Sequence, residues 1–420
     1  MSSAPMDTST RYWVQALCWA TVTLEGFDIV ALSASLPSIL DNRDLGMGPA
    51  EATYVTTFSL VGIMVGAILV GPLSDRWGRK ICILASIAVF SLFTIMVPLA
   101  GNAETFAALR FIAGVGLGAC MPAALTMMSE TTPDDQRARG TTLTMTGYHV
   151  GAVLTALVAL VVVDDWHLLF VIGGVAGFIV LPLMWWKMPE TNQVALARRT
   201  GADPAAAGEP ATKVPFTAAL QQPYLVASIA TWVACFMGLL LVYGLNSWLP
   251  TIMREAGYEL ATSLTLLLLL NLGGVAGLVV AGLYGDRRGI RGSTLIWFGA
   301  AAILLAALSI QMPTLLLNGA VFLTGFFVFS AQVLVYAWIT RYYPPAVRGT
   351  ALGLASGIGR LGSIVGPTIT GALVTAGVAY PWGFYTFAIV AALALTAMLV
   401  VPARVERLAS QNQPLKETLA

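Results

Sequence analysis

Two ten-residue stretches of this chain follow one pattern: Gly71-Pro-Leu-Ser-Asp75-Arg76-Trp-Gly78-Arg79-Lys80 and Gly282-Leu-Tyr-Gly-Asp286-Arg287-Arg288-Gly289-Ile-Arg291. Each contains a glycine, an aspartate, a basic residue, a second glycine and then further basic charge. Each also follows the second apolar segment of a series, so the two stretches hold matching places in two parts of the chain. Duplication of this kind is found in folds that are built from structural repeats. The pattern therefore predicts two related halves.

The composition excludes a soluble globular protein. Of the 420 residues, 57% are hydrophobic and 10% are charged, whereas a soluble domain usually has about 25% charged residues. The net charge of +1 gives no electrostatic reason to expect nucleic acid binding. The cysteines have neither the spacing of a metal site nor the aqueous surroundings of a disulfide, so we interpret them as packing residues. They are Cys18, Cys82, Cys120 and Cys235.

Apolar runs long enough to cross a bilayer, about 20 residues each, recur along the chain. The first, from Arg11 to Leu36, is too long for a signal peptide and is interpreted as a permanent span. Residues 189–221 interrupt the series and have the proline, alanine and glycine content of a surface linker. We predict an all-α integral membrane protein with a six-helix half (1–188), a cytoplasmic linker (189–221) and a second six-helix half (222–420). The twelve predicted spans are 11–38, 50–72, 79–99, 104–130, 138–163, 167–188, 222–250, 260–284, 292–311, 314–340, 347–377 and 381–402.

The lysines and arginines predict the orientation. With these spans, 18 of the 22 basic residues fall on the side that holds the termini and the linker. Arg43 and Arg254 fall on the other side, and Arg110 and Arg360 fall within spans. Because basic loops stay in the cytoplasm, we expect both termini on the cytoplasmic face of a bacterial inner membrane.

The charges of the duplicated stretches predict an ionic cluster at the cytoplasmic helix ends. Asp75 and Arg79 are placed to pair with each other and with charges on neighbouring helix ends. Such a cluster could latch the two halves together when the cytoplasmic side is closed. The alternative is that these charges only set the topology. The predicted latch residues are Asp75, Arg76, Arg79, Glu130, Arg139, Asp286, Arg287 and Arg348.

These motifs resemble the major facilitator superfamily. The first stretch matches its signature Gly-x-Leu-x-Asp-Arg-x-Gly-Arg-Lys, and Arg110-Phe-Ile-Ala-Gly114-Val-Gly116-Leu-Gly118 and Pro189-Glu190-Thr191 are further matches. Finer features resemble the aromatic acid:proton symporter branch. Glu25-Gly26-Phe27-Asp28 resembles its Asp-Gly-x-Asp motif, with glutamate replacing the first aspartate. Span 11 and the Met121-Pro122 pair are also similar to that branch. The resemblance implies inward transport of benzoates, hydroxybenzoates, gentisate, hydroxyphenylpropionates or muconate together with protons.

Four charged side chains lie within predicted spans: Glu25, Asp28, Arg110 and Arg360. Such a group costs at least about 2.5–3.5 kcal/mol at the bilayer centre and usually has a function. Glu25 and Asp28 are three residues apart and share one helix face. Two carboxylates this close in a poorly solvated cavity cannot both ionise easily, so one of them could bind and release a proton.

We hypothesise that Asp28, helped by Glu25, carries the coupled proton, and that Arg110 pairs with Asp28 until the proton arrives. The alternative is that both carboxylates pair with basic groups only to fix helix packing. A guanidinium stays protonated and forms paired hydrogen bonds with a carboxylate, so Arg360 is the predicted anchor for the substrate carboxylate. A structural pair with a carboxylate of the other half is the alternative.

Weaker candidates for the substrate path are polar or aromatic residues within spans. The aromatic rings could stack on an aromatic substrate, although such rings more often pack or anchor helices. His149 is equally well explained as a proton relay or as a core histidine. The Gly357-x-Gly359-x-x-Gly362 run lies within a span, and we interpret it as a helix-packing stretch and not as a nucleotide site. The candidates are Tyr148, His149, Tyr243, Asn246, Asn271, Gln332, Tyr336 and Trp338.

The leading prediction is therefore a proton-coupled importer of a small aromatic carboxylate that works by alternating access. A proton-driven exporter of drugs or metabolites is the alternative, although an exporter of cations would have less use for Arg360. An integral-membrane enzyme is a remote third possibility, because no His-Glu-x-x-His or Gly-x-Ser-x-Gly motif occurs. No ATP-binding loop occurs either, so we expect a proton gradient as the energy source and no cofactor. We expect a monomer whose partners are the carboxylate, protons and lipid.

Overall fold

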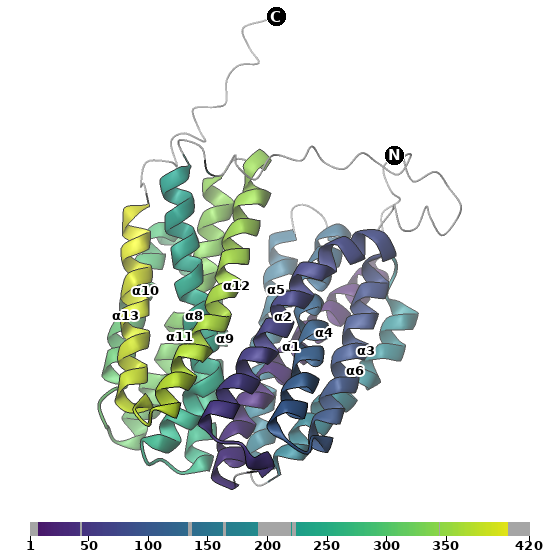
Figure 1. Ribbon diagram of the computed structural model, residues 1–420. Coiled ribbons are helices and arrows are strands. Elements are labelled where there is room, and N and C mark those ends of the chain that lie inside the picture. The colour runs from purple at the N-terminus through teal and green to yellow at the C-terminus, as the bar shows by residue number, and fades with distance from the viewer. Residues whose placement is uncertain are drawn as a thin grey trace, which may run out of the picture. The chain divides into compact units, whose positions relative to one another are not determined.

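The computed structural model describes residues 7–42, 44–132, 137–162, 165–191, 220, 224–343 and 345–401. Over these residues the chain folds into α-helices joined by short connections (Figure 1). Two short 3₁₀ helices, η1 (Asp44–Gly46) and η2 (Val97–Leu99), lie in the connections. The α-helices are α1 (Thr8–Asn42), α2 (Pro49–Trp77), α3 (Arg79–Met96), α4 (Ala103–Thr131), α5 (Arg137–Val161), α6 (Trp166–Lys187), α8 (Leu225–Glu255), α9 (Leu260–Arg288), α10 (Ile290–Ala307), α11 (Thr314–Tyr342), α12 (Pro345–Thr375) and α13 (Ala379–Val400).

Each predicted span corresponds to one of these helices, so the all-α membrane fold is confirmed. Eleven of the described helices are long and apolar enough to cross a bilayer. The twelfth, α12, is 31 residues long, but its many glycines and hydroxyl side chains reduce its hydropathy. Helix α8 continues to Glu255, beyond the predicted limit of residue 250, because a helix can extend past the apolar run that crosses the hydrocarbon. Most of the predicted linker lies outside the described residues.

The described chain divides into two compact units by contact. The first takes α1 to α6 together with Asn246–Asn271 and Val374–Gly377. The second takes Thr212–Leu245, Leu272–Leu373 and Val378–Ala420. These units follow packing and not chain order, so the division into six-helix halves at the linker stays a prediction.

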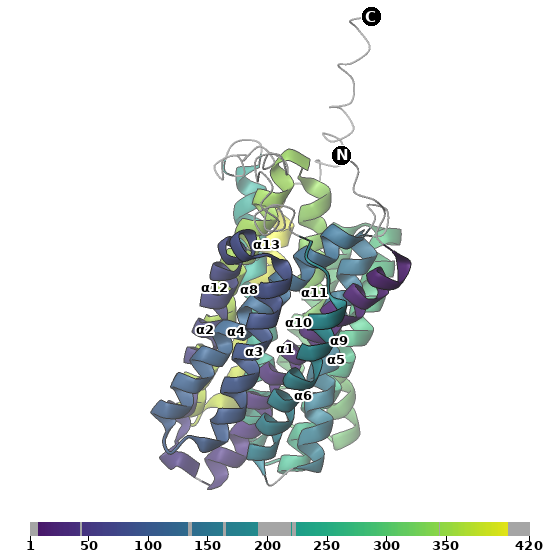
Figure 2. The ribbon, with the colours of Figure 1, turned by 90° about the vertical axis from the view of Figure 1, so that its right-hand side faces the viewer.

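Glycines bring the helices of the first unit into close contact. A Cβ atom at Gly114 or Gly118 of α4 would overlap the backbone of α2, and one at Gly116 would overlap the backbone of α3. Figure 2 shows α3 beside α4, with α6 on the other side of α3. Because water is absent between membrane helices, this close backbone approach is a main source of their association. The Gly114-x-Gly116-x-Gly118 motif is therefore a two-sided packing stripe.

Helices α9, α10 and α11 repeat this construction. Helices α2, α3 and α4 have 29, 18 and 29 residues, and α9, α10 and α11 also have 29, 18 and 29. The connections that lead into α3 and α10 are also similar. Gly78 before α3 and Gly289 before α10 both have positive φ, at 100° and 88°. Glycines are suited to this left-handed conformation, which has a steric cost for other residues. The predicted internal duplication therefore extends from sequence to helix length and turn geometry.

The glycine-rich run of α12 packs against α8. A Cβ at Gly359 would contact Cys235, and one at Gly362 or Gly366 would overlap the backbone of α8 at Phe236 or Leu240. Since the run lies inside one continuous helix, the packing interpretation is confirmed for Gly359 and Gly362. A Cβ at Gly357 would meet no atom within 4 Å, so this glycine takes no part in the close approach.

Candidate functional site

The centre of the first unit contains a buried ion pair. Arg110 of α4 donates from Nη1 to Asp28 Oδ2 of α1 at 2.7 Å, and each side chain is 1% exposed. Thr94 of α3 donates to the other Asp28 oxygen at 2.7 Å. The expected pairing of Arg110 with Asp28 is therefore present, and the structure adds Thr94, whose position no sequence motif indicated.

Arg110 has further oxygen atoms nearby. Its Nη2 lies 3.4 Å from the backbone carbonyl oxygen of Asp28 and 3.3 Å from the hydroxyl oxygen of Ser59. The guanidinium carbon lies 5.6 Å from the centre of the Phe170 ring, within the range of a cation–π contact. A guanidinium with several acceptors keeps part of its hydrogen bonding if the carboxylate loses its charge.

Glu25, Tyr148 and His149 are buried near the same part of the first unit. Glu25 is fully buried midway along α1. Gly26, the next residue, lies so close to α5 that a Cβ there would overlap the Tyr148 carbonyl oxygen. The Tyr148 and His149 rings meet edge to face at 5.2 Å. These contacts make α1 and α5 direct neighbours at the level of the predicted proton-coupling residues.

The second unit holds a polar and aromatic cluster around Arg360. Arg360 of α12 is partly buried and donates to the hydroxyl oxygen of Tyr243 on α8 at 3.2 Å. Tyr336 of α11 lies near Arg360, Ser356 and Gln332. Four predicted substrate residues, on three helices, therefore gather in one place.

Three other candidates have structural partners. Asn271 donates to Asn246 Oδ1 at 3.0 Å and to the Leu267 carbonyl oxygen at 3.0 Å, and both asparagines are buried. Trp338 stacks on Tyr342 with ring centres 4.2 Å apart. Packing on Tyr342 therefore explains the position of the Trp338 ring.

Among the described residues, no group of three histidine, cysteine or acidic side chains is placed to hold a metal ion.

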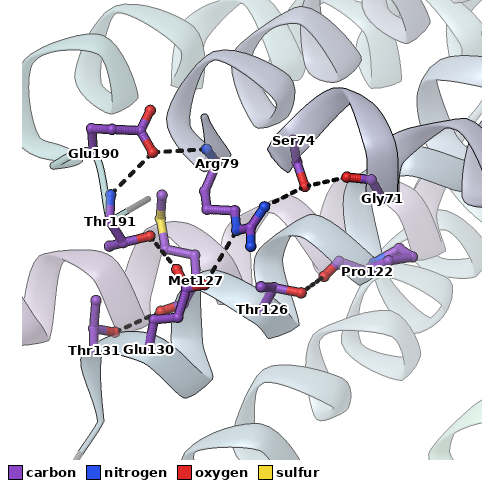
Figure 3. Close-up of polar contacts among 10 residues, drawn as sticks. All are labelled: Gly71, Ser74, Arg79, Pro122, Thr126, Met127, Glu130, Thr131, Glu190 and Thr191. Carbon is purple, nitrogen blue, oxygen red and sulfur yellow. Dashed lines mark hydrogen bonds and ion pairs between the residues drawn. The ribbon is translucent and has the colours of Figure 1, made fainter. Parts of the chain in front are cut away.

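A second ionic cluster lies at one end of the first unit (Figure 3). Arg79 pairs with Glu130 at the end of α4 at 3.2 Å and donates to Ser74 Oγ at 2.8 Å. The Arg79 backbone N–H donates to Glu190 at 2.8 Å, and Thr191 donates to Glu130 at 2.5 Å. The expected Arg79–Glu130 pair is present. The sequence indicated Glu190 and Thr191 only as part of a motif, and the structure shows what they bind.

These described contacts join the α2–α3 connection, the end of α4 and the segment after α6, all within one unit. The side chains of Asp75, Arg139, Asp286 and Arg348 lie outside the described residues, while those of Arg76 and Arg287 are exposed. The role of the cluster as a latch between the halves therefore stays a prediction.

The second duplicated stretch has the equivalent of one contact made by the first stretch, but not of the other. Lys80 donates to the carbonyl oxygen of Trp185 near the end of α6 at 2.7 Å, and Arg291 donates to those of Leu399 and Val401 at the end of α13. Both cations thus bind the last carbonyl groups of a helix. Ile290 takes the place of Arg79, and because its side chain is uncharged, position 290 cannot form the equivalent of the Arg79–Glu130 ion pair.

Replacing Gly78 with alanine is expected to destabilise this cluster. Gly78 has φ of 100°, and a Cβ there would overlap the Glu190 carboxylate. The left-handed backbone alone costs about 1–2 kcal/mol for a residue with a Cβ. A lower midpoint of thermal unfolding in detergent would show this loss. Gly71→Ala is the matched control, because Gly71 is helical and a Cβ there would meet no atom within 4 Å. Equal midpoints for the two variants would contradict the prediction.

The comparison with known protein families agrees with this geometry. The sequence profile of the Major Facilitator Superfamily matches residues 18–335 and 284–419. The chain belongs to this superfamily. The repeated helix lengths, the duplicated connections and the glycine stripe between α2, α3 and α4 are therefore features of a superfamily member. It is a multi-pass membrane protein of a family of transporters.

Curated relatives extend over nearly the whole chain. A gallate transporter from Pseudomonas putida is 31% identical and covers 93% of this chain and 91% of its own length. A gentisate transporter from Corynebacterium glutamicum is 33% identical and covers 91% and 86%. A 4-hydroxybenzoate transporter from Pseudomonas aeruginosa is 30% identical and covers 93% and 92%. The resemblance to the aromatic acid branch is thus confirmed.

Solved structures agree on the fold. The chain superimposes on a D-xylose–proton symporter with a TM-score of 0.76 and 16% identity, covering 93% of this chain and 98% of the other. A bacterial homolog of the human lysosomal transporter Spinster gives a TM-score of 0.71 and 17% identity, with coverage of 94% and 98%. At these identities the likeness concerns the fold alone.

Proposed function

We propose that this protein imports small aromatic carboxylates together with protons, by alternating access. The observation that carries the proposal is the fully buried Asp28–Arg110 pair, with Thr94 on the second carboxylate oxygen. Ionisable groups at membrane depth are costly and are usually kept for proton or ion transfer. The named substrates of the relatives, gallate, gentisate and 4-hydroxybenzoate, are the source of the substrate class.

The proton step follows from the contacts of the ion pair. A proton that binds Asp28 Oδ2 removes the carboxylate charge and weakens its bond with Arg110. Arg110 then keeps the Asp28 carbonyl oxygen and the Ser59 hydroxyl as acceptors, which lowers the cost of leaving a buried cation without its counter-ion. Glu25, one turn away on α1, assists by making simultaneous ionisation of both carboxylates unfavourable.

The substrate step uses the cluster of the second unit. Arg360 binds the substrate carboxylate through two parallel N–H donors, and Tyr243 orients the guanidinium from one side. The Tyr243 and Tyr336 rings are available to pack against the substrate ring. His149, Tyr148 and Asn246 are proposed to line the path, and the Arg79–Glu130 cluster to stabilise one state of the cycle. We propose the bacterial inner membrane as the location, with both termini in the cytoplasm.

The test is uptake of labelled 4-hydroxybenzoate by liposomes that contain the purified protein, with an alkaline lumen and an acidic exterior. We expect accumulation above equilibrium that an ionophore abolishes, because the proton gradient supplies the energy. Protein-free liposomes are the essential control, since neutral aromatic acids cross bilayers unaided. Uptake that only equilibrates would contradict proton coupling. If benzoate, gentisate and gallate also fail, export becomes the better proposal.

A further inference from the structure

The side-chain amide of Gln332 is buried in the second unit, where its polar contacts are looser than normal hydrogen bonds. Gln332 is 4% exposed, and neither its nitrogen nor its oxygen makes a well-formed hydrogen bond with the described residues. The Tyr336 hydroxyl and the Cys235 thiol lie near the amide without completing such a bond. Leaving a buried donor and a buried acceptor unsatisfied is unfavourable. Buried polar groups of this kind need an explanation, and binding of a ligand is one.

The Gln332 amide fits in its position because the residue facing it on α8 is a glycine. A Cβ at Gly238 of α8 would overlap Gln332 Oε1, so any larger residue at 238 would move the amide. Tyr336, one turn further along α11, lies near both Gln332 and Arg360. One turn is about 5.4 Å, which is comparable to the width of an aromatic ring. Gln332 and Arg360 therefore share Tyr336 as a neighbour, and this shared neighbour is the basis for inferring one ligand that contacts both groups.

The Gln332 amide and the Arg360 guanidinium differ in the hydrogen bonds that they can make. An amide offers both a donor and an acceptor, whichever way it is turned, whereas a guanidinium only donates. A carboxylate only accepts, and the permanent charge of Arg360 makes it the better partner for that group. A phenolic hydroxyl both donates and accepts. The phenolic hydroxyl is therefore a better hydrogen-bonding partner for the Gln332 amide than a carboxylate or an unsubstituted ring edge.

We propose that Gln332 binds a ring hydroxyl group of the substrate, so that the protein selects hydroxylated aromatic carboxylates over benzoate. This inference rests on the proposed function and assigns its specificity to one residue. A site built to hydrogen-bond a hydroxyl rejects the analogue that lacks it, because its own polar groups are then left unpaired. We expect the best hydroxybenzoate isomer to bind about tenfold to a hundredfold more tightly than benzoate.

Calorimetric titration of the purified protein with benzoate and with 2-, 3- and 4-hydroxybenzoate tests this. In Gln332→Leu the ratio of the benzoate dissociation constant to that of the best isomer should fall to about one to threefold, with benzoate binding retained. Asn318→Leu is the matched control. Asn318 lies on the same helix, and its amide oxygen also lacks a hydrogen bond among the described residues. It should keep the parent ratio.

Gly238→Ala is the second variant, because it displaces the amide without removing it, and it should also reduce the ratio. If Gln332→Leu fails to fold, the ratio of dissociation constants measured for Gly238→Ala tests the inference instead. A parent protein that binds all four acids equally, or a Gln332→Leu protein with an unchanged ratio, would overturn the inference and leave the proposed function standing. If the parent binds none of the four acids, the proposed substrate class fails, and the inference fails with it.

Discussion

Arg110→Ala is expected to abolish gradient-driven uptake and to lower the free energy of unfolding by about 3–5 kcal/mol. The reason is that Asp28 would remain fully buried as a carboxylate, with Thr94 as its one remaining side-chain hydrogen-bond donor among the described residues. An uncompensated buried charge costs far more than the intact pair contributes. The measurement is the midpoint of thermal unfolding in detergent, together with uptake in liposomes.

The double variant Asp28→Asn/Arg110→Ala separates the two effects. Because it removes both charges, we expect most of the lost stability to return, while uphill accumulation stays absent. Arg288→Ala is a matched control. Arg288 is an exposed arginine over the Tyr284 ring, and its loss should cost less than about 1 kcal/mol. An Arg110→Ala protein as stable as the parent would contradict the buried pair.

Asp28→Asn alone tests the proton role. This variant mimics the protonated state, and the side acceptors of Arg110 remain in place. Exchange of labelled for unlabelled substrate should therefore persist while accumulation against a gradient is lost. An Asp28→Asn protein that accumulates substrate as well as the parent would show that the proton binds elsewhere.

Arg360→Lys is expected to weaken binding of aromatic carboxylates about tenfold to a hundredfold, although the positive charge is retained. An ammonium lacks the planar fork that gives two parallel bonds to a carboxylate. Losing one hydrogen bond to a charged group costs about 1.5–3 kcal/mol, and each 1.4 kcal/mol is a factor of about ten in affinity. Titration with 4-hydroxybenzoate measures the change directly.

Tyr243→Phe is the matched control for this prediction. It removes the hydroxyl that accepts from Arg360 at 3.2 Å but leaves the guanidinium in place. We expect a smaller loss of affinity than in Arg360→Lys, because Tyr243 orients the arginine and does not bind the carboxylate in its place. Equal affinity of Arg360→Lys and the parent, with the thermal midpoint unchanged, would show that Arg360 has a structural role only.

The sequence predicted the fold closely because its signals are local. An apolar run of about 20 residues is sufficient to indicate a span, and each predicted span corresponds to one helix. The ends were less certain, as α8 shows, because hydropathy reports where the hydrocarbon ends and not where the helix ends. The duplicated stretches at Gly71 and Gly282 also predicted the repeat that the helix lengths display.

The candidate residues were partly predictable. Asp28 and Arg110 were identified because charge inside an apolar run is conspicuous in any sequence. Thr94, Ser59 and Gly238 were not, because threonine, serine and glycine are common in membrane helices and nothing local distinguishes those that face a charge or an amide. Glu190 was visible as part of a motif, but its contact with the Arg79 backbone was not.

The sequence alone determined the membrane as solvent, the helical class, the number of spans and the charges that need partners. These depend on composition and on neighbours along the chain. The tertiary structure contains the predicted Asp28–Arg110 and Arg79–Glu130 pairs, and it alone decided the partners that the sequence did not indicate: Thr94 for Asp28 and Tyr243 for Arg360. The physical reason is that such pairs join helices far apart in sequence. Their geometry is set by how closely glycine stripes allow the backbones to pack, which no single helix reveals.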